Sequence, residues 1–490
     1  MTKKIAAVML TAAMLISLLA SCGGNSGKDD VQTTIAQLTE AEETTGTDLT
    51  HDLPDDLKLN GETINIWYFT KNSDVSEKFL DIQGELNGDI VDEALYYRNL
   101  RVEERLGCDL VFTDTGVASS DVGNEISKMI MTGSTEYDIF NVVQWNSAKY
   151  VVNGLYLNII DMPYVDIEKP WWSAYYTNEM NIGKNSRYFL VGDISIDTIR
   201  CISCMYFNKN MFENYYSSPD DLYAQVLDGA WTLDSLYTYT EGAYKDLNGD
   251  TKPDAKDQFG LLTNNYNNID IMYYGAGARA TARDSDNLTV LDVNNPRTAS
   301  VMEKIYALCY DNQGTFIGAP LDNTKHFNDG YALFLMGFLY SSELLRSMEN
   351  DYGIIPPAKF DEEQENYSAV VHDIATLICL PQTCAKLDQC GAVLELMAYE
   401  SWKDVTPAYY ETAMKTKYTR DQASSQIIDI IHDNAMTDIA YAFGDNFNSM
   451  GYIARRMISG KNSNFTSYYE SNEAAALTKM QQLIDAFLNL

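Results

Sequence analysis

The sequence predicts an α/β protein whose main body is divided into two lobes. Strand-like and helix-like segments alternate over the first part of that body, which favours a largely parallel sheet. About 430 of the 490 residues follow a polar N-terminal region, and a body of that size exceeds one ordinary hydrophobic core. From about Asp388 to the C-terminus, the spacing of apolar residues is mostly helical.

The first 22 residues have the layout of a secretory signal. A basic start at Lys3 and Lys4 is followed by an apolar stretch from Ile5 to Ala20 and by Cys22. The run Leu-Ala-Ser-Cys, followed by two glycines, resembles the lipobox of bacterial lipoproteins. That resemblance implies cleavage before Cys22, a diacylglycerol on its thiol, and anchoring on the extracytoplasmic face of the cell membrane. The alternatives are an ordinary signal with an incidental cysteine, or a spanning helix, which needs about 20 apolar residues.

Residues 23–60 are predicted to form a disordered tether. They are rich in Gly, Ser, Asp, Thr, Gln and Glu and show no sustained apolar period, so they bury too little surface to offset the entropy of ordering. Folded sequence is expected from Gly61, because residues 64–69 form a strand-like apolar run.

Composition excludes one class of partner and suggests one class of ligand. A formal net charge of −35 argues against a nucleic-acid partner, because phosphate binding needs clustered Lys and Arg. The plain interpretation of this charge is an acidic, soluble surface. The chain contains 34 Tyr, 17 Phe and 6 Trp, and a surplus of Tyr and Trp suits ligands with flat apolar faces and hydroxyl rims, such as sugars. No phosphate-binding loop and no convincing Ser/His/Asp set is present.

The cysteines beyond Cys22 are odd in number, so at least one thiol is unpaired. They are Cys108, Cys201, Cys204, Cys309, Cys379, Cys384 and Cys390. Cys201 and Cys204 have the spacing of a redox motif, but they lie in a stretch that resembles a buried strand. No second cysteine pair has zinc-finger spacing, so packed free thiols are expected.

The order of elements follows from periodicity and end signals. Strands are expected over 64–69, 108–114, 137–145, 199–212, 351–355 and 367–384, and helices over 95–107, 125–134 and after Thr232. Gly107 ends the first helix, and Ser235 replaces the ideal Glu of a capping box that begins at Thr232. The strand at 351–355 must stop at Pro356.

Residues 246–257 are predicted to bind one structural calcium ion. Oxygen atoms fall at positions 1, 3, 5, 7, 9 and 12 of the loop, on Asp246, Asn248, Asp250, the carbonyl of Lys252, Asp254 and Asp257. This spacing wraps oxygens around a hard cation and resembles the loops of EF-hands and dockerins. Thr251 replaces the usual Gly at position 6, where a β-branched residue is disfavoured. The alternative is a solvated acidic turn.

Several segments, in their order, resemble the extracellular solute-binding proteins of ABC importers, in the sugar-binding group related to maltose-binding protein. They include INIWYF, EYDIFNVVQW, PWW before YFLVGD, CMYFNKNMF, GAWTLDSL, DQFGLLT, DYGIIPPAKFDEEQENY and LPQTC. Together they cover most of residues 61–490. The resemblance implies a two-lobe periplasmic-binding-protein-like (type II) fold, with a hinge between the lobes and a ligand in the cleft. Lobe 1 is expected over 61–188 and 372–430, and lobe 2 over 189–371 and 431–490.

Ligand contacts are expected from residues near the cleft. The predicted set is Trp145, Asn146, Trp171, Trp172, Asp193, Tyr273, Tyr274, Tyr340, His372 and Asp373. The aromatic faces would stack on pyranose rings, while Asp193, Asn146 and Asp373 would accept hydroxyl hydrogen bonds. For each aromatic the alternative is core packing, and for His372 it is a structural histidine with satisfied partners.

The favoured function is a non-enzymatic receptor that captures a solute, expected to be an oligosaccharide, and delivers it to the membrane subunits of an ABC importer. One alternative is an anchored glycoside hydrolase, which needs two carboxyl groups at a defined separation; no pattern singles out such a pair. Another is a helical, glycan-capturing lipoprotein of an outer-membrane transporter, against which the early strands argue.

Overall fold

The computed structural model describes residues 49–69, 81–114, 116–118, 120–415 and 422–489. The signal sequence, Cys22 and residues 23–48 of the expected tether lie outside these residues. The folded body begins at His51, so the expectation that the tether reaches residue 60 is wrong. Leu53 and Leu59 are buried in the same apolar cluster as Ile64 and Val102, and this burial offsets the entropy of ordering the segment.

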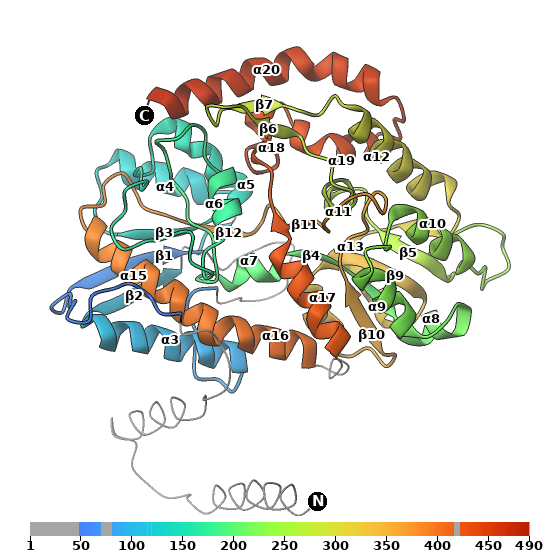
Figure 1. Cartoon of the computed structure of the whole chain (residues 1–490), viewed down its shortest axis with the longest axis horizontal. Coiled ribbons are helices and arrows are strands. Elements are labelled where there is room, and N and C mark those ends of the chain that lie inside the picture. Colours follow the sequence, from blue (N-terminus) through green and yellow to red (C-terminus); the bar gives the residue numbers. More distant parts are fainter. Residues whose placement is uncertain (1–48, 70–80, 115, 119, 416–421, 490) are drawn as a thin grey trace, which may run out of the picture. The chain divides into compact units, whose positions relative to one another are not determined.

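Lobe 1 is built on a four-stranded sheet with the order β12-β3-β1-β2, at the left of Figure 1. Its strands are β1 (Thr63–Tyr68), β2 (Asp109–Asp114), β3 (Ile139–Val143) and β12 (Thr376–Cys379). β1 is parallel to β2 and β3, and β12 is antiparallel to β3. Its helices are α3 (Ile90–Leu106), α4 (Val122–Met131), α5 (Gln144–Ser147), η2 (Ala148–Asn153), α6 (Ala174–Glu179), α15 (Leu387–Glu400), η4 (Ser401–Val405) and α16 (Thr406–Lys415).

Helix α3 begins and ends at residues that are recognisable helix caps in the sequence. The Asp89 carboxylate caps it by accepting from the backbone N–H groups of Val91 and Asp92. Gly107 ends it in the left-handed region, at φ +63°, as predicted. Such a conformation suits glycine because it lacks a Cβ.

Lobe 2 is built on a mixed five-stranded sheet with the order β10-β4-β9-β5-β8. Its strands are β4 (Ser203–Asn208), β5 (Phe259–Thr263), β8 (Thr315–Ile317), β9 (Ala332–Phe338) and β10 (Tyr352–Ile355). Its other elements are α8 (Lys209–Tyr215), α9 (Pro219–Leu227), α10 (Leu233–Gly242), α11 (Asn267–Gly275), hairpin β6 (Thr281–Arg283) and β7 (Thr289–Leu291), α12 (Pro296–Tyr306), η3 (Ala307–Asp311), α13 (Pro320–Asn328) and α14 (Ser341–Leu344). The capping box of Thr232 and Ser235 is present.

Three chain segments cross between the lobes and lie side by side. The first contains α7 (Ile196–Arg200), the second β11 (Ala369–Val370), and the third α17 (Gln422–Asp433) and β13 (Ala435–Met436). β11 pairs in parallel with β13, and Ile202 forms a bridge with Val371. The hinge therefore contains a two-stranded sheet that is separate from the sheets of the two lobes.

The chain crosses between the lobes at residues other than those predicted as lobe boundaries. Leu190 still pairs with Ile378 of lobe 1, so the first crossing comes after the predicted end at 188. Helix α17 packs on α9 and β10, so residues 422–430 lie against lobe 2 instead of lobe 1. Residues 199–212, predicted as one strand, instead include the end of α7, β4 and the start of α8. The backbone N–H of Asp197 in α7 donates a hydrogen bond to the buried carboxylate of Asp81. This bond stabilises the helical turn that overlaps the start of the predicted strand.

The C-terminal part is helical, as predicted. It comprises α18 (Ile439–Ala442), η5 (Gly444–Phe447), η6 (Met450–Tyr452), α19 (Ile453–Ser459) and α20 (Phe465–Asn489). Helix α19 packs on α11 of lobe 2, whereas α20 contacts both η2 of lobe 1 and α12 of lobe 2, along the top of Figure 1.

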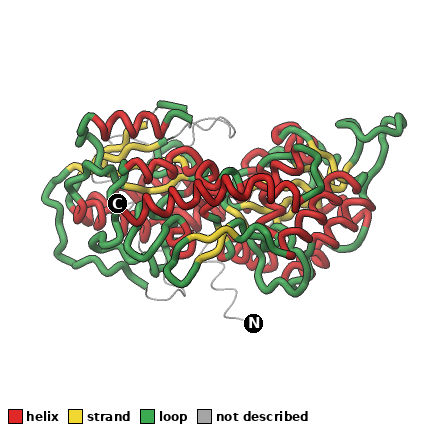
Figure 2. Tube along the Cα trace, turned by 90° about the horizontal axis from the view of Figure 1, so that it is seen from above, coloured by secondary structure: helices red, strands yellow, loops and turns green. Residues whose placement is uncertain are grey.

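Most strands fall into two groups, each flanked by helices (Figure 2). The predicted two-lobe α/β fold is therefore confirmed, and the sheets contradict the alternative of a largely helical protein. Within the described ranges, no helix combines the length and the apolar character that crossing a bilayer requires.

Trp171 and Trp172 belong to the core of lobe 1, so the prediction that they contact ligand is wrong. Both are buried. Their indole N–H groups donate to the two oxygens of Glu395, at 2.9 and 2.7 Å. A buried Trp needs such an acceptor for its single donor, and burial raises the pKa of Glu395.

Tyr273 and Tyr274 are also buried, in the core beneath α11. Their hydroxyl groups donate to the carbonyls of Arg279 and Gly451, at 3.1 and 2.9 Å. The prediction of ligand contact is therefore wrong for this pair too.

Cys201 and Cys204 are buried free thiols, as expected.

Replacing Glu395 with alanine is expected to destabilise the protein, because two buried indole N–H groups lose their acceptor. Each unsatisfied donor costs about 1–3 kcal/mol. Urea unfolding followed by tryptophan fluorescence measures the loss. Glu395→Gln keeps one acceptor oxygen and should lose less. Equal unfolding midpoints for wild type and Glu395→Ala would show that the two bonds contribute nothing.

Candidate functional site

Three strands end against the crossing segments. After β3, the backbone N–H groups of Gln144 and Trp145 donate to the carbonyls of Ala375 and Asp373, both at 2.9 Å. After β9, the N–H of Tyr340 donates to the carbonyl of Arg200 at 2.9 Å. After β5, the side chain of Asn267 contacts His372. Open α/β sheets bind ligands at the carboxyl ends of strands, so this junction is the candidate site.

Trp145 supplies an exposed aromatic ring from lobe 1. It lies in α5, directly after β3, where the sequence placed it, and 36% of its surface is exposed. Asn146 follows it in the same short helix. A large aromatic side chain left accessible at a strand end suits stacking on a ligand face.

Tyr266 supplies a second exposed ring, from lobe 2. It immediately precedes α11 and is 55% exposed. The guanidinium carbon of Arg455 lies 4.2 Å from the centroid of its ring and 4.2 Å from that of Tyr452. The cation is therefore held close to two aromatic rings, a favourable electrostatic arrangement.

Arg455 is the centre of a buried ionic network. It donates to Asp270 of α11 through two nitrogens and lies 3.6 Å from an oxygen of Asp373. Burial, together with the charge of Asp373, raises the pKa of Asp270 to about 7 although Arg455 opposes the shift. The other oxygen of Asp270 is buried without a hydrogen-bond partner among the described residues. The described part of this network therefore contains a carboxylate oxygen without a hydrogen bond.

His372 and Asp373 lie at the base of this network, between β11 and β12. The His372 Nδ1 lies 2.8 Å from an Asp373 oxygen, and its Nε2 lies 2.8 Å from the Asn267 amide nitrogen. Burial alone would raise the pKa of Asp373, but His372 and Arg455 hold it below its usual value. Both ring nitrogens of His372 are satisfied, so it links the lobes as a structural histidine. The side chain of Asp373 also accepts from the Tyr452 hydroxyl at 3.2 Å.

Tyr340 lies just past β9, where the resemblance places a cleft aromatic. Its ring is half-buried and stacks on Phe338, with centroids 5.6 Å apart and an angle of 19°. Beside it is a small cavity of about 40 Å³, lined partly by the amides of Asn264, Asn267 and Asn323. Amides donate and accept, so this edge of the site can pair with hydroxyl groups.

Asp193 lies apart from the site, so its predicted role as a ligand acceptor is wrong. It is buried and accepts from the Thr406 hydroxyl at 2.9 Å. Its other oxygen lies 3.9 Å from the His432 Nε2 of α17. Asp193 therefore connects lobe 1 to the third crossing segment.

The sequence analysis missed several residues of the site, among them Tyr266, Asn267, Asp270, Tyr452 and Arg455. The first two had a usable signal, because an Asn-rich turn directly follows the buried strand β5. Tyr452 and Arg455 had none, since Tyr452 of η6 and Arg455 of α19 reach the site only through the packing of η6 on α18 and of α19 on α11.

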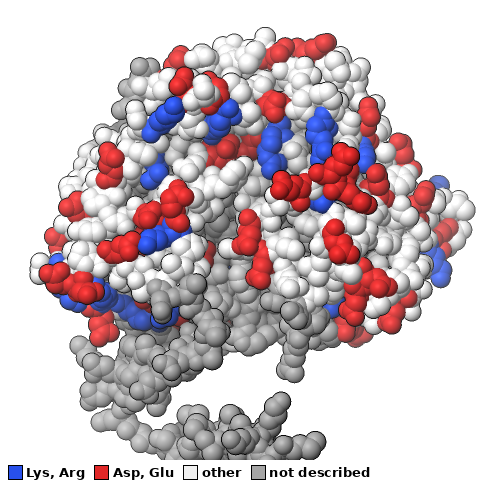
Figure 3. Space-filling model, in the orientation of Figure 1, with Lys and Arg blue, Asp and Glu red and all other residues white. Residues whose placement is uncertain are grey.

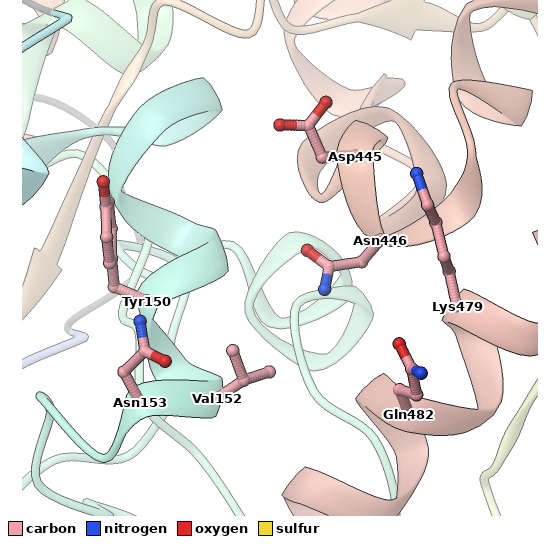
Figure 4. Close-up of a pocket in the computed structure, with 7 residues that line it drawn as sticks. All are labelled: Tyr150, Val152, Asn153, Asp445, Asn446, Lys479 and Gln482. Carbon is pink, nitrogen blue, oxygen red and sulfur yellow. The ribbon is translucent and has the colours of Figure 1, made fainter.

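A polar groove lies next to the site along the same helix. Helix α5, which carries Trp145, runs directly into η2, and the groove separates η2 from η5 and α20 (Figure 4). Its volume is about 320 Å³. It is lined by Tyr150, Val152, Asn153, Asp445, Asn446, Lys479 and Gln482. Both lobes thus contribute to this groove.

The acidic loop after α10 has some features expected of a calcium loop. The oxygens of Asp246 accept from the backbone N–H groups of Gly249 and Thr251, at 2.6 and 2.9 Å. Thr251 adopts φ +63°, the strained conformation that the sequence implied. In the described part of the chain, however, no three His, Cys, Asp or Glu side chains converge as metal ligands.

Acidic side chains are spread over both lobes on the face shown in Figure 3, with Lys and Arg side chains among them. This face has no broad basic patch in its described part. It therefore gives no support to binding of a nucleic acid.

Comparisons with known proteins identify the fold. Neither a protein-family model nor a curated protein matches the sequence. A cyclo/maltodextrin-binding protein complexed with maltotetraose matches with a TM-score of 0.56 and 12% identity, over 86% of this chain and 97% of that chain. The chain has the two-lobe fold of ABC solute-binding proteins.

Two further solved structures agree. An ABC transporter solute-binding protein from Thermotoga lettingae, bound with α-D-tagatose, has a TM-score of 0.52 and 14% identity, over 86% of this chain and all (100%) of that chain. An ABC substrate-binding protein from Listeria monocytogenes, in complex with cycloalternan, has a TM-score of 0.53 and 10% identity, over 85% and 99%. At these identities the likeness establishes the fold.

The Asp193–His432 contact predicts a pH-dependent part of stability. Burial alone would lower the pKa of His432, but Asp193 and Asp433 raise it to about 9. Its unfolded pKa is about 6.5, so the stabilisation is complete below that pH and is lost as the pH rises through about 9. His432→Gln should therefore lose on the order of 1 kcal/mol at pH 6, after allowance for solvent screening, and almost nothing at pH 10.

Urea unfolding at both pH values measures this difference. His326→Gln is the control, because burial lowers the pKa of His326 and its pH dependence should have the opposite sign. A His432→Gln deficit that is the same at both pH values would contradict the ion pair.

Proposed function

We propose that the protein is a membrane-anchored receptor that captures an oligosaccharide between its lobes and delivers it to an ABC importer. The observation that carries this proposal is the pair of exposed rings, Trp145 on lobe 1 and Tyr266 on lobe 2, beside a buried polar network. Aromatic faces stack on the apolar faces of sugar rings, while the surrounding amides and carboxylates pair with hydroxyl groups.

Capture by lobe closure is supported by the way in which the lobes are joined. Short segments connect them, and the second of these segments carries His372 and Asp373 into the site. A ligand that contacts both Trp145 and Tyr266 would bind the closed arrangement better than an open one. That difference in affinity is what drives closure.

An oligosaccharide is favoured over a single sugar by the groove beside the site. A chain stacked on Trp145 can continue along η2 toward Asn153 and Gln482. The carbohydrate ligands named for the similar solved structures support the same class.

The anchor is proposed from the sequence alone. Cleavage before Cys22 and attachment of lipid to its thiol would hold the protein on the extracytoplasmic face of the cell membrane. Two or more acyl chains make such an anchor stable, because each buried methylene contributes roughly 0.8 kcal/mol.

Binding without chemistry is proposed over glycoside hydrolysis. The network beside Tyr266 contains the carboxyl groups of Asp270 and Asp373, and both are paired with Arg455. Hydrolysis requires two carboxyl groups on opposite sides of the scissile bond, one of them able to donate a proton. A shared guanidinium between them leaves no room for that arrangement.

Replacing Trp145 or Tyr266 with alanine is expected to weaken oligosaccharide binding at least tenfold, which corresponds to about 1.4 kcal/mol. The loss follows because each ring contributes a stacking face. Isothermal titration calorimetry with a panel of oligosaccharides, combined with chromatography of the sugars afterwards, measures binding and turnover together.

Tyr331→Ala is the matched control. Tyr331 is 45% exposed but precedes β9 at the opposite end of the strand from Tyr340, so its loss should leave affinity unchanged. Release of shorter sugars by the wild type would overturn the receptor proposal. Binding of peptides or amines instead of sugars would refute the substrate class while keeping the fold.

We also propose that the loop Asp246–Asp257 binds one calcium ion with a structural role. The hydrogen bonds from the N–H groups of Gly249 and Thr251 to Asp246 support it. Ligand formation would require the side chains of Asp250 and Asp254 to turn from backbone N–H groups toward the ion. Calcium would then relieve repulsion among the clustered carboxylates.

EDTA is therefore expected to lower the melting temperature, and added calcium to restore it. Thermal unfolding followed by circular dichroism measures both, and metal analysis gives the stoichiometry. Asp246→Ala should abolish the response, whereas Thr251→Gly should strengthen it, because glycine adopts positive φ without strain. An unchanged melting temperature in EDTA, without copurifying metal, would make the loop an acidic turn.

A further inference from the structure

Cys384 and Cys390 are a pair of thiols in contact. Their sulfur atoms lie 3.9 Å apart, and this is the one thiol–thiol contact within the described part of the chain. A disulfide needs about 2.05 Å between sulfurs, so bond formation requires an approach of about 2 Å. The other described cysteines are buried.

The two cysteines occupy different local structures. The N–H of Cys384 donates to the carbonyl of Pro381 at 2.9 Å, which places Cys384 in the turn after β12. Cys390 lies in the first half of α15, and its N–H donates to the carbonyl of Lys386 at 2.9 Å. A residue in a turn can move toward a helix without breaking the hydrogen bonds of a sheet. We therefore expect the Cys384 sulfur to move toward the Cys390 sulfur when the bond forms.

The pair also differs in access and acidity. Cys384 is partly exposed, whereas Cys390 is fully buried. The hydrogen bond from Cys390 lowers the pKa of the Cys384 thiol, with help from the backbone N–H and charge of Lys386. The same hydrogen bond and burial raise the pKa of Cys390. Cys384 is thus the thiol that solvent reagents meet first, and its lowered pKa favours the nucleophilic thiolate form.

We propose that Cys384 and Cys390 form a redox-active dithiol, which a small-molecule disulfide oxidises to an intramolecular disulfide. The Cys384 thiolate attacks one sulfur of the donor, forming a mixed disulfide and releasing one thiolate. Cys390 then loses its proton and its thiolate attacks the Cys384 sulfur, while the second donor thiolate leaves and takes up a proton. Overall, two protein thiols are oxidised and one donor disulfide is reduced to two thiols.

The place of the dithiol in the fold separates it from ligand binding. Strand β12 is antiparallel to β3, so its start lies beside Trp145 and its end, with the turn, lies at the opposite edge of the sheet. There the Lys386 ammonium donates to the carbonyl of Thr63 at 2.7 Å and lies 3.1 Å from Asp138. The disulfide would fasten this turn to α15 and leave the interlobe site unchanged.

Trypsin provides a direct test, because it cleaves after Lys386, between the two cysteines. The reduced full-length protein is incubated with oxidised glutathione, quenched with N-ethylmaleimide without reduction, digested and analysed by mass spectrometry. The expected product is the peptide 360–386 linked to the peptide 387–403, with a mass two hydrogens below their sum. Reduction before digestion should separate the two peptides.

Three variants identify the atoms involved. Cys379→Ser, which removes the other cysteine of peptide 360–386, should leave the linkage intact. Cys390→Ser should stop the reaction at a glutathione adduct on Cys384, whereas Cys384→Ser should give neither adduct nor linkage. The proposal is overturned if both cysteines remain fully alkylated at every glutathione ratio, or if Cys390 links to another cysteine. Oligosaccharide affinity should be equal before and after oxidation; a changed affinity would contradict the placement of the dithiol away from the site.

Discussion

The buried guanidinium of Arg455 is the interaction on which the arrangement of the cleft depends. It joins three parts of the chain that are distant in sequence: α19 itself, Asp270 in α11, and Asp373 in the second crossing segment. A buried charge is costly unless it is paired and hydrogen-bonded. The position of Arg455 is therefore fixed by its partners, and with it the positions of Tyr266 and Tyr452, whose rings lie against it.

This network places two carboxyl groups around one cation. His372 and Arg455 hold the pKa of Asp373 below its usual value, while burial raises the pKa of Asp270 to about 7. The two groups interact, so they titrate as a pair.

Local patterns predicted the strands β1, β2, β3 and β10, the end of α3 at Gly107, the cap of α10 at Thr232 and one side of the site, while packing determined the rest. Trp145 could be placed because it directly follows a buried strand, and the rule for strand ends then applies. Trp171 and Trp172 carry the same aromatic signal, but nothing local reveals that Glu395, more than 200 residues later, accepts both of their N–H groups. Likewise, Arg455 gives no local sign of its partners, which lie on elements that meet only in the folded protein.

The pairing of β11 with β13 has a consequence for how the chain reaches this fold. The sheet of lobe 1 is completed by β12, which is made only after every strand of the five-stranded lobe 2 sheet, and the hinge is completed by residues 435–436. Pairings of such large sequence separation form slowly, because the intervening loop must be closed first. Lobe 1 is not a continuous stretch of chain, so a nascent polypeptide stopped before the hinge strands holds a lobe 1 sheet that lacks β12 and leaves the edge of β3 open, the state most exposed to aggregation and proteolysis.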